Sequence, residues 1–214
     1  MHDFSPEYIA GLLRSGLPGR KSHLKMIPPG RRLFVSDLDE NQIRYSSVLL
    51  LLFPHEGKLH TCLTKRATAM KNHPGQISLP GGKIEEGEKP EVTALREAQE
   101  EVGINPSSVL LLGRLSELYV QVSQFKIFPY VAWTDKKPDF VLNVAEAEKL
   151  ILFPIQDFLE GQKLKYCPVQ TTSGLLQVPC FHFADEIIWG ATAMILSEFI
   201  DLLTQAKHQF TMSQ

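Results

Sequence analysis

The longest uninterrupted apolar run, Val48–Phe53 (VLLLLF), is the feature that most limits how this chain can fold. It is far shorter than the ~20 residues that a membrane-spanning helix needs. It therefore predicts a buried strand. A second strand-like segment, 58–66, follows after a turn at 54–57 and completes a hairpin pattern.

The segments around this hairpin mix helical and strand patterns. Ser5 and Pro6 favour a helix start, and Gly16 its end. Pro90 and Gly103 bracket a second helix. We also expect a short strand near Ile77, strands within 107–120 and 125–134, a short helix near 155–159, a hairpin over 164–183 and an amphipathic helix over 189–205. The mixture lacks regular βαβ alternation, so it favours an α/β or α+β sandwich with a mixed sheet.

Length and charge limit the domain organisation and the partners. The chain has 214 residues and a formal net charge of −2, from 22 basic and 24 acidic residues. We expect an N-terminal helix and basic arm over 1–40, one main domain over 41–207 and a tail over 208–214. The total charge argues against binding to bulk nucleic acid. Residues 14–32 contain basic but no acidic side chains, which predicts a loop or arm that is either solvated or contacts an anion or a second copy.

The cysteines and the N-terminus predict a compartment. Cys62, Cys167 and Cys180 are odd in number and form no CxxC pair, so a disulfide framework or zinc ribbon is not expected. We expect three buried, reduced thiols. No signal peptide is apparent at the N-terminus. Together these features predict a cytoplasmic protein without a membrane segment.

Three glutamates lie close together in the helix that begins near Pro90. With Glu97 at 0°, Glu100 falls at about 300° and Glu101 at about 40°, so the acids share one face. Leu95, Ala98 and Val102 form the buried stripe. Like charges at these spacings each cost an isolated helix roughly 0.2–0.5 kcal/mol. Either the face is solvated, or a hard divalent cation such as Mg²⁺ or Mn²⁺ compensates the charge.

Gly81 and Gly82 precede this helix and would allow backbone to approach a ligand closely. They do not form a Walker A loop, because Ile84 follows Lys83 where Ser or Thr is required. The sequence also contains no GxGxxG and no GxSxG. The two glycines alone therefore do not identify a ligand site, and their interpretation depends on the residues that follow them.

The whole segment 82–104, GKIEEGEKPEVTALREAQEEVGI, resembles the Nudix box, GX5EX7REUXEEXGU, where U is aliphatic. Gly82, Glu88, Arg96-Glu97 and Glu100-Glu101 stand in register. Gly103 and Ile104 complete the match, and Ala98 at the first U position is its only weak point.

The resemblance implies a Nudix α/β/α sandwich with a mixed sheet, in which the box forms a loop, a helix and a loop. It implies hydrolysis of a diphosphate linked to another group, with Mg²⁺ or Mn²⁺ as cofactor. The metal would be held by Glu97, Glu100 and Glu101, joined by a backbone carbonyl near Gly82. Arg96 and Glu88 would orient these carboxylates.

Residues 62–82, CLTKRATAMKNHPGQISLPGG, resemble the signature of the coenzyme A diphosphatase subfamily, LLTxR(S/A)xxxRxxxGxxxFPGG. Three positions depart from it: Cys62, Lys71 and Leu79. Lys71 keeps the charge but loses the bidentate fork of arginine. IWGATA at 188–193 also resembles the start of the terminal helix in this subfamily.

The activity that these resemblances imply is attack of water on the diphosphate of coenzyme A, free, acylated or oxidised, giving 3′,5′-ADP and 4′-phosphopantetheine. Arg66, Lys71 and Gly81 are the candidates for binding the substrate. The general base is left open between Glu97 and Glu146, which lies in an NxxE segment, with Glu148 as a nearby spare.

Two other functions compete with this one. A hydrolase of another diphosphate, such as NADH or ADP-ribose, is compatible with the box. A non-catalytic binding module would be expected to lose box acids, yet Glu88, Glu97, Glu100 and Glu101 all remain. The expected partner is a small diphosphate rather than nucleic acid or membrane, and a homodimer is possible.

Overall fold

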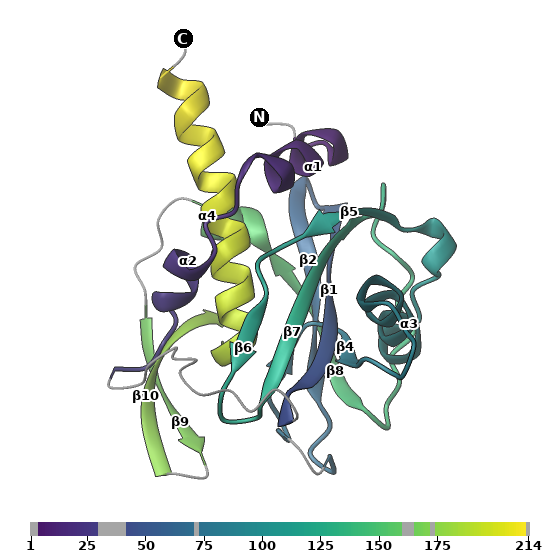
Figure 1. The fold of residues 1–214 in the computed structure, drawn as a ribbon, viewed down its shortest axis with the longest axis vertical. Coiled ribbons are helices and arrows are strands. Elements are labelled where there is room, and N and C mark those ends of the chain that lie inside the picture. Colours follow the sequence, from purple (N-terminus) through teal and green to yellow (C-terminus); the bar gives the residue numbers. More distant parts are fainter. Residues whose placement is uncertain (1–3, 30–41, 71–72, 160–164, 172–173, 213–214) are drawn as a thin grey trace.

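The computed structural model describes residues 4–29, 42–70, 73–159, 165–171 and 174–212. Within them, eight strands form one mixed sheet whose main order is β3-β2-β1-β7-β5 (Figure 1). β1 and β7 run parallel, and the other pairs run antiparallel. The strands of this sheet are β1 (Arg44–His55), β2 (Lys58–Arg66), β3 (Ile77–Ser78), β4 (Gly81–Lys83), β5 (Leu110–Arg114), β6 (Leu118–Val120), β7 (Phe125–Trp133) and β8 (Ala147–Pro154).

Side chains of β1 alternate between two cores, and this alternation creates the layers. Leu49, Leu51 and Phe53 pack in the core beneath α3 (Pro90–Val102). Leu50 and Leu52 pack in the larger core on the opposite face, beneath α4 (Gly190–Met212). Figure 1 shows α3 on one side of the sheet and α4 on the other. The predicted mixed-sheet sandwich is confirmed, and the helices are α1 (Pro6–Ser15), α2 (Arg20–Leu24), α3 (Pro90–Val102) and α4 (Gly190–Met212), with 3₁₀ turns at Pro106–Ser108 and Ile155–Phe158.

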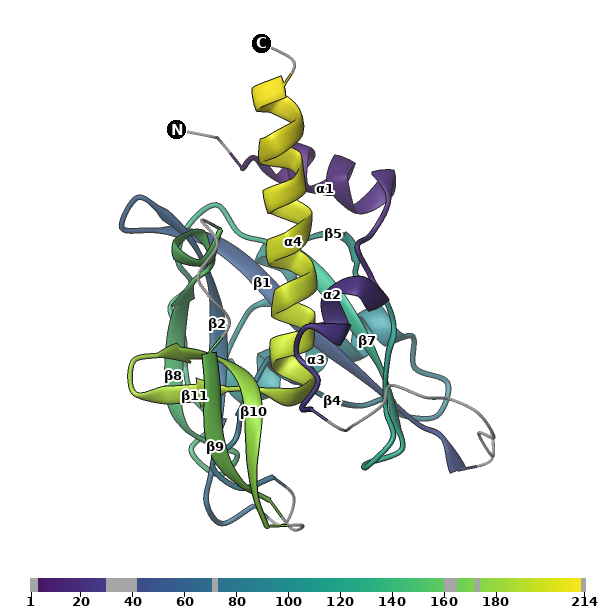
Figure 2. The same cartoon turned by 90° about the vertical axis from the view of Figure 1, so that its left-hand side faces the viewer.

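The N-terminal segment packs against the main body. α1 begins at the predicted cap, where the Tyr8 amide donates to the Ser5 hydroxyl at 3.2 Å, and it buries Ile9 and Leu13. The interpretation of 14–32 as a loop or arm is wrong for Arg20–Leu24, which forms α2 beside α4 (Figure 2). Tertiary contacts through buried His23 explain a helix too short for sequence periodicity to indicate.

A three-stranded sheet of β9 (Lys165–Thr171), β10 (Gly174–Phe183) and β11 (Glu186–Ile188) lies beside the main sheet (Figure 2). The predicted hairpin is confirmed, but β11 was not expected. The prediction of three reduced thiols is wrong for Cys167 and Cys180, which form a disulfide with a Cα–Cα distance of 6.3 Å. The hairpin register pairs Cys167 with Val178 and so brings residues 13 apart into bonding range, which a search for CxxC spacing cannot detect.

Cys62 stays a free, buried thiol, and burial raises its pKa to about 12. Because the other two cysteines are oxidised, the cysteines no longer support a reducing cytoplasm as the compartment. No helix in the described segments is both long enough and apolar enough to cross a bilayer. α4 continues to Met212, beyond the boundary expected at residue 207, and the domain boundaries themselves stay a prediction.

Candidate active site

α3 carries the predicted acids and is fixed to the sheet by small apolar residues. Pro90 occupies the first turn, and Gly103 ends the helix with φ = 72° while its amide donates to the Gln99 carbonyl at 3.0 Å. This left-handed conformation suits glycine. Ala98 and Val102 are fully buried as predicted, whereas Leu95 is only half-buried. The acids are thereby held along the flank of α3.

The three box glutamates share this flank but differ in exposure. The Glu100 side chain is 52% exposed and the Glu97 side chain 15% exposed. Glu101 is only 4% exposed. Glu101 therefore does not belong to a solvated acidic face, because its carboxylate faces protein groups on neighbouring segments.

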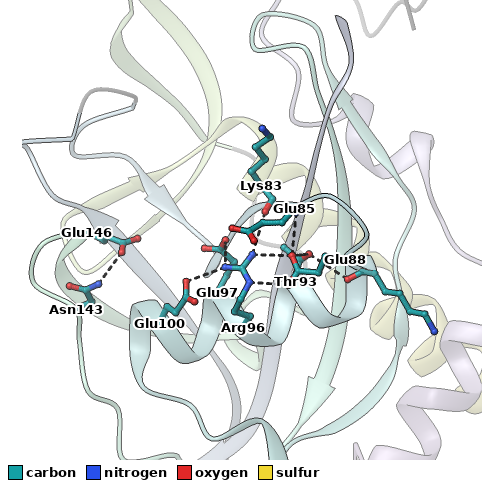
Figure 3. Close-up of polar contacts among 10 residues, drawn as sticks. Lys83, Glu85, Glu88, Thr93, Arg96, Glu97, Glu100, Asn143 and Glu146 are labelled. Carbon is teal, nitrogen blue, oxygen red and sulfur yellow. Dashed lines mark hydrogen bonds and ion pairs between the residues drawn. The ribbon is translucent and has the colours of Figure 1, made fainter. Parts of the chain in front are cut away.

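Arg96 gathers the surrounding carboxylates (Figure 3). Its Nε and Nη2 donate to the two Glu88 oxygens at 2.9 and 3.1 Å, a bidentate pair. Its Nη1 donates to Glu97 at 2.8 Å and to Glu100 at 3.1 Å. Hydrogen bonds from Arg96 and then from the Thr93 hydroxyl lower the pKa of Glu88 to about 2. Arg96 and Glu88 thus lie where they would orient the acids of α3.

The two glycines of β4 allow close packing on two sides, Gly81 against β1 and Gly82 against Glu97 of α3. A Cβ on Gly82 would lie 2.3 Å from the Glu97 carboxyl carbon. A Cβ on Gly81 would lie 2.4 Å from the Ser47 carbonyl oxygen. Gly81 is therefore required by the close approach of β4 to β1, whereas Gly82 leaves the space that the Glu97 carboxylate occupies.

The electrostatics of the site disfavour a full set of ionised acids. Burial raises the pKa of Glu101 to about 7, although the Gly81 amide and the charge of Arg66 act in the opposite direction. Burial also raises the pKa of Glu97, against the hydrogen bond from Arg96. The charge of Glu146 contributes to both upward shifts. The carboxylates therefore lie close enough to repel one another.

Glu146 reaches this group from a separate segment, between α3 and β8. Figure 3 shows its side chain directed toward the Glu97 and Glu100 side of α3. Its carboxylate accepts from Asn143 Nδ2 at 2.9 Å, and its carbonyl accepts from the Ala67 amide at 2.8 Å. Glu148, the spare candidate, instead lies 3.5 Å from Lys65 Nζ in an ion pair. The structure thus brings Glu146, and not Glu148, to the acids of α3.

Arg66 ends β2, and its positive charge opposes the rise that burial causes in the pKa of Glu101. Lys71, the other predicted phosphate contact, lies outside the described residues. Sequence reasoning missed Thr93, which donates to Glu88 at 2.7 Å, and it noted the NxxE segment that contains Asn143 without giving Asn143 a role. The i,i+3 spacing of Asn143 and Glu146 was the signal that could have revealed this role, because asparagine commonly closes such turns.

The donor set fits a hard divalent cation, since all candidate ligands are oxygen atoms. A cation would also offset the burial, and the weaker repulsion among the acids, that raise the pKa values of Glu97 and Glu101. Across the described residues, however, no three acidic, histidine or cysteine side chains lie close enough together to hold a metal ion as they stand. Arg96 bonds two of the candidate ligands instead, so binding would require Arg96 to release part of its contact.

Comparisons with known proteins agree with this fold. The family model of the NUDIX domain matches residues 44–170. The fold is also similar to a crystal structure of a NUDIX hydrolase from Alicyclobacillus acidocaldarius, with a TM-score of 0.52 and 16% identity over 74% of this chain and 91% of that one. At this identity the structural likeness supports the fold alone.

Three curated relatives extend the comparison. Nudix hydrolase 22, chloroplastic, of Arabidopsis thaliana is 35% identical over 71% of this chain, which spans about half (52%) of that relative's length. Nudix hydrolase 3 of Caenorhabditis elegans is 28% identical over 85% of this chain and 82% of its own length. A peroxisomal coenzyme A diphosphatase of Mus musculus is 31% identical over 77% of this chain and 68% of its own length. With a family model covering more than half of the residues, the chain belongs to the Nudix family.

Proposed function

We propose that this protein is a divalent-metal-dependent Nudix hydrolase that cleaves the diphosphate of coenzyme A or its acylated or oxidised forms. The observation that carries the proposal is the close approach of the Glu97 carboxylate to Gly82, with Glu101 buried near the opposing charges of Glu146 and Arg66. Hydrolysis of an anionic diphosphate requires acidic side chains that would hold a cation and a positively charged side chain that would bind phosphate.

The choice of coenzyme A rests on residues 62–82 and on the relatives named coenzyme A diphosphatases. Two of the three departures from the signature, Cys62 and Leu79, are buried in the cores. These two substitutions change packing rather than a surface that a substrate touches. Only Lys71 affects a candidate contact with phosphate, by replacing a fork of donors with a single ammonium group.

The proposed reaction uses the residues of this chain in separate roles. Glu97, Glu100, Glu101 and the Gly82 carbonyl would hold Mg²⁺ or Mn²⁺, which when bound neutralises phosphate charge and makes water more acidic. Arg66 and Lys71 bind the diphosphate oxygens. Glu146 accepts the proton of the attacking water while the new P–O bond forms and the bond to the bridging oxygen breaks. The products are 3′,5′-ADP and 4′-phosphopantetheine.

Glu146 is preferred to Glu97 as the base because of their surroundings. Glu97 is bonded by Arg96 and closely packed against Gly82, which suits a fixed ligand. Within the described part of the chain, Glu146 receives a single side-chain hydrogen bond, from a neutral amide. One of its oxygens is therefore left to face the acids of α3.

The second candidate, hydrolysis of NADH or ADP-ribose, is compatible with the box and is left open by the departures from the coenzyme A signature, of which Lys71 is the one at a candidate contact. Measuring kcat/KM for coenzyme A, NADH and ADP-ribose with Mg²⁺ and with Mn²⁺ distinguishes the two. We expect the highest value for coenzyme A and no turnover in EDTA. A higher value for either dinucleotide-like substrate would replace the proposal with the second candidate.

Two variants test the site in the same assay. Glu97→Gln should lower kcat by at least about 100-fold, because it removes a ligand charge. Glu86→Gln changes an exposed acid of the same box loop and should act like the wild type. Full activity of Glu97→Gln would reject the metal assignment.

A cytoplasmic location and a homodimer stay predictions.

A further inference from the structure

The turn at Asn143–Ala147 is organised around one side chain. The Asn143 carbonyl accepts from the Glu146 amide at 3.0 Å and from the Ala147 amide at 2.9 Å. Its Oδ1 accepts from the Ala145 amide at 3.2 Å. Its Nδ2 donates to the Glu146 carboxylate at 2.9 Å. Asn143 therefore fixes both the backbone of the turn and the acid that the turn presents.

This turn is also hydrogen-bonded to α3 and to the end of β2, the two elements that carry Glu101 and Arg66. The Asn143 amide donates to the Glu101 carbonyl at 2.9 Å, and the Val141 amide donates to the Val102 carbonyl at 3.0 Å. These carbonyls belong to the last turn of α3, where intrahelical donors run out. The Glu146 carbonyl accepts from Ala67, just after β2. The position of Glu146 is thus set relative to Glu101 on one side and to Arg66 on the other.

From these contacts we infer that Asn143 is a positioning residue that directs the Glu146 carboxylate toward the acids of α3. A general base must be held within a fraction of an ångström of its productive place, and a misplacement of 1 Å can cost about 100-fold in rate. The Nδ2 donor holds one carboxylate oxygen of Glu146, so the other oxygen keeps a defined direction. This inference rests on the proposed function in so far as it assigns Glu146 the proton of water.

A purely structural role for Asn143 would make different predictions, and Asn105 supplies the matched case. Asn105 Oδ1 accepts from the Ser107 amide at 3.0 Å, the same i,i+2 contact that Asn143 makes with Ala145. Its side chain bonds the Ser107 amide and hydroxyl, and it lies after α3, in a different turn from Glu146. The bond from Nδ2 to Glu146 is therefore the difference that the test must isolate.

Asn143→Asp isolates it, because aspartate keeps the shape and the acceptor for Ala145 but has no donor for Glu146. We expect kcat to fall about 10–100-fold, with KM within about two-fold of the wild type. Asn143→Ser, which is too short to reach Glu146, should show the same split if the aspartate variant fails to fold. Asn105→Asp should keep wild-type kcat and KM.

A double-mutant cycle distinguishes positioning from general damage. Glu146→Gln alone should lower kcat by about 10²–10⁴-fold. Adding Asn143→Asp to it should cost less than about three-fold more, because the residue that Asn143 positions is already disabled. An undiminished loss in the Glu146→Gln background would overturn the inference, as would a kcat of Asn143→Asp equal to that of Asn105→Asp.

Crystal structures of the wild type and Asn143→Asp give a readout that does not depend on turnover. The Glu146 carboxylate should turn away from α3 in the variant while the backbone of the turn stays in place. An unmoved Glu146 would overturn the positioning role, whatever the activity. A wild type that hydrolyses no diphosphate, with Glu146 displaced in the variant, would reject the proposed function and leave the positioning role standing.

Discussion

Three glutamates of the same helix, Glu97, Glu100 and Glu101, lie in three different environments. Glu100 is largely solvated, Glu97 lies between Arg96 and Gly82, and Glu101 is buried. Sequence spacing placed all three on one face of the helix, which is correct for direction. Sequence spacing could not predict which of the three acids is buried. The burial of Glu101 depends on the strand that contains Gly81 and on the turn at 141–147, which lie outside the helix.

Glu88 supplies a prediction at this scale. Its pKa is lowered to about 2, so its stabilising effect is fully present above its ordinary pKa of 4.5 and is lost as the pH falls through about 2. Glu88→Gln should reduce the free energy of unfolding at pH 7 by about 1–3 kcal/mol. Urea unfolding should show a smaller difference between the two proteins at pH 3. A difference that is equal at pH 7 and pH 3 would contradict the ion pair with Arg96.

Helices and strands with strong local signals were predictable, and those that depend on packing were not. Capping residues located α1 and α3, and the apolar run located β1. α2 and β11 have five and three residues, too few for periodicity to reveal. The box motif identified the acids of α3, but only the fold shows that Glu146 and not Glu148 joins them. Nor could spacing reveal the Cys167–Cys180 pair, because the hairpin register creates it.

Two glycines test how the helices are built. Gly11 lies inside α1, and a Cβ added there would meet no atom of the described residues within 4 Å, so Gly11→Ala should stabilise the protein by about 0.5–1 kcal/mol. Gly103 has φ = 72°, and a Cβ there would lie 2.8 Å from Val141 Cβ. Gly103→Ala should destabilise by more than about 1 kcal/mol. Thermal unfolding of both variants checks the signs, and stabilisation by Gly103→Ala would contradict the cap.

At the scale of the whole molecule, one buried carboxylate joins the N-terminal segment to α4 and to the sheet. Glu198 accepts from the Gly19 amide at 3.1 Å and from the Ser116 amide at 3.2 Å, and it lies 2.9 Å from His23 Nε2. Burial opposes ionisation of Glu198, but the hydrogen bonds from His23 and Ser116 outweigh it and lower its pKa. The segment 4–29 is therefore part of the fold rather than an appendage to it.

Removing this carboxylate should affect the whole molecule. Glu198→Ala leaves buried donors unpaired and should lower the free energy of unfolding by about 3–5 kcal/mol. Lys25→Ala removes an exposed partner of Asp201 just after α2 and should cost less than about 1 kcal/mol. Chemical denaturation measures both. Equal effects of the two changes would show that Glu198 does not join these elements.

The disulfide can be tested by counting free thiols, without any measurement of activity. The unreduced protein, denatured and treated with a thiol reagent, should show one thiol per chain, from Cys62. After reduction it should show all three cysteines. Three thiols without reduction would contradict the Cys167–Cys180 bond and restore the expectation of reduced cysteines.

The most direct test of the central claim is to identify the products of coenzyme A by mass spectrometry after incubation with the protein and Mg²⁺ or Mn²⁺. The proposed function predicts 3′,5′-ADP and 4′-phosphopantetheine in equal amounts. Coenzyme A that remains intact with both metals, while the protein is folded, would contradict the claim.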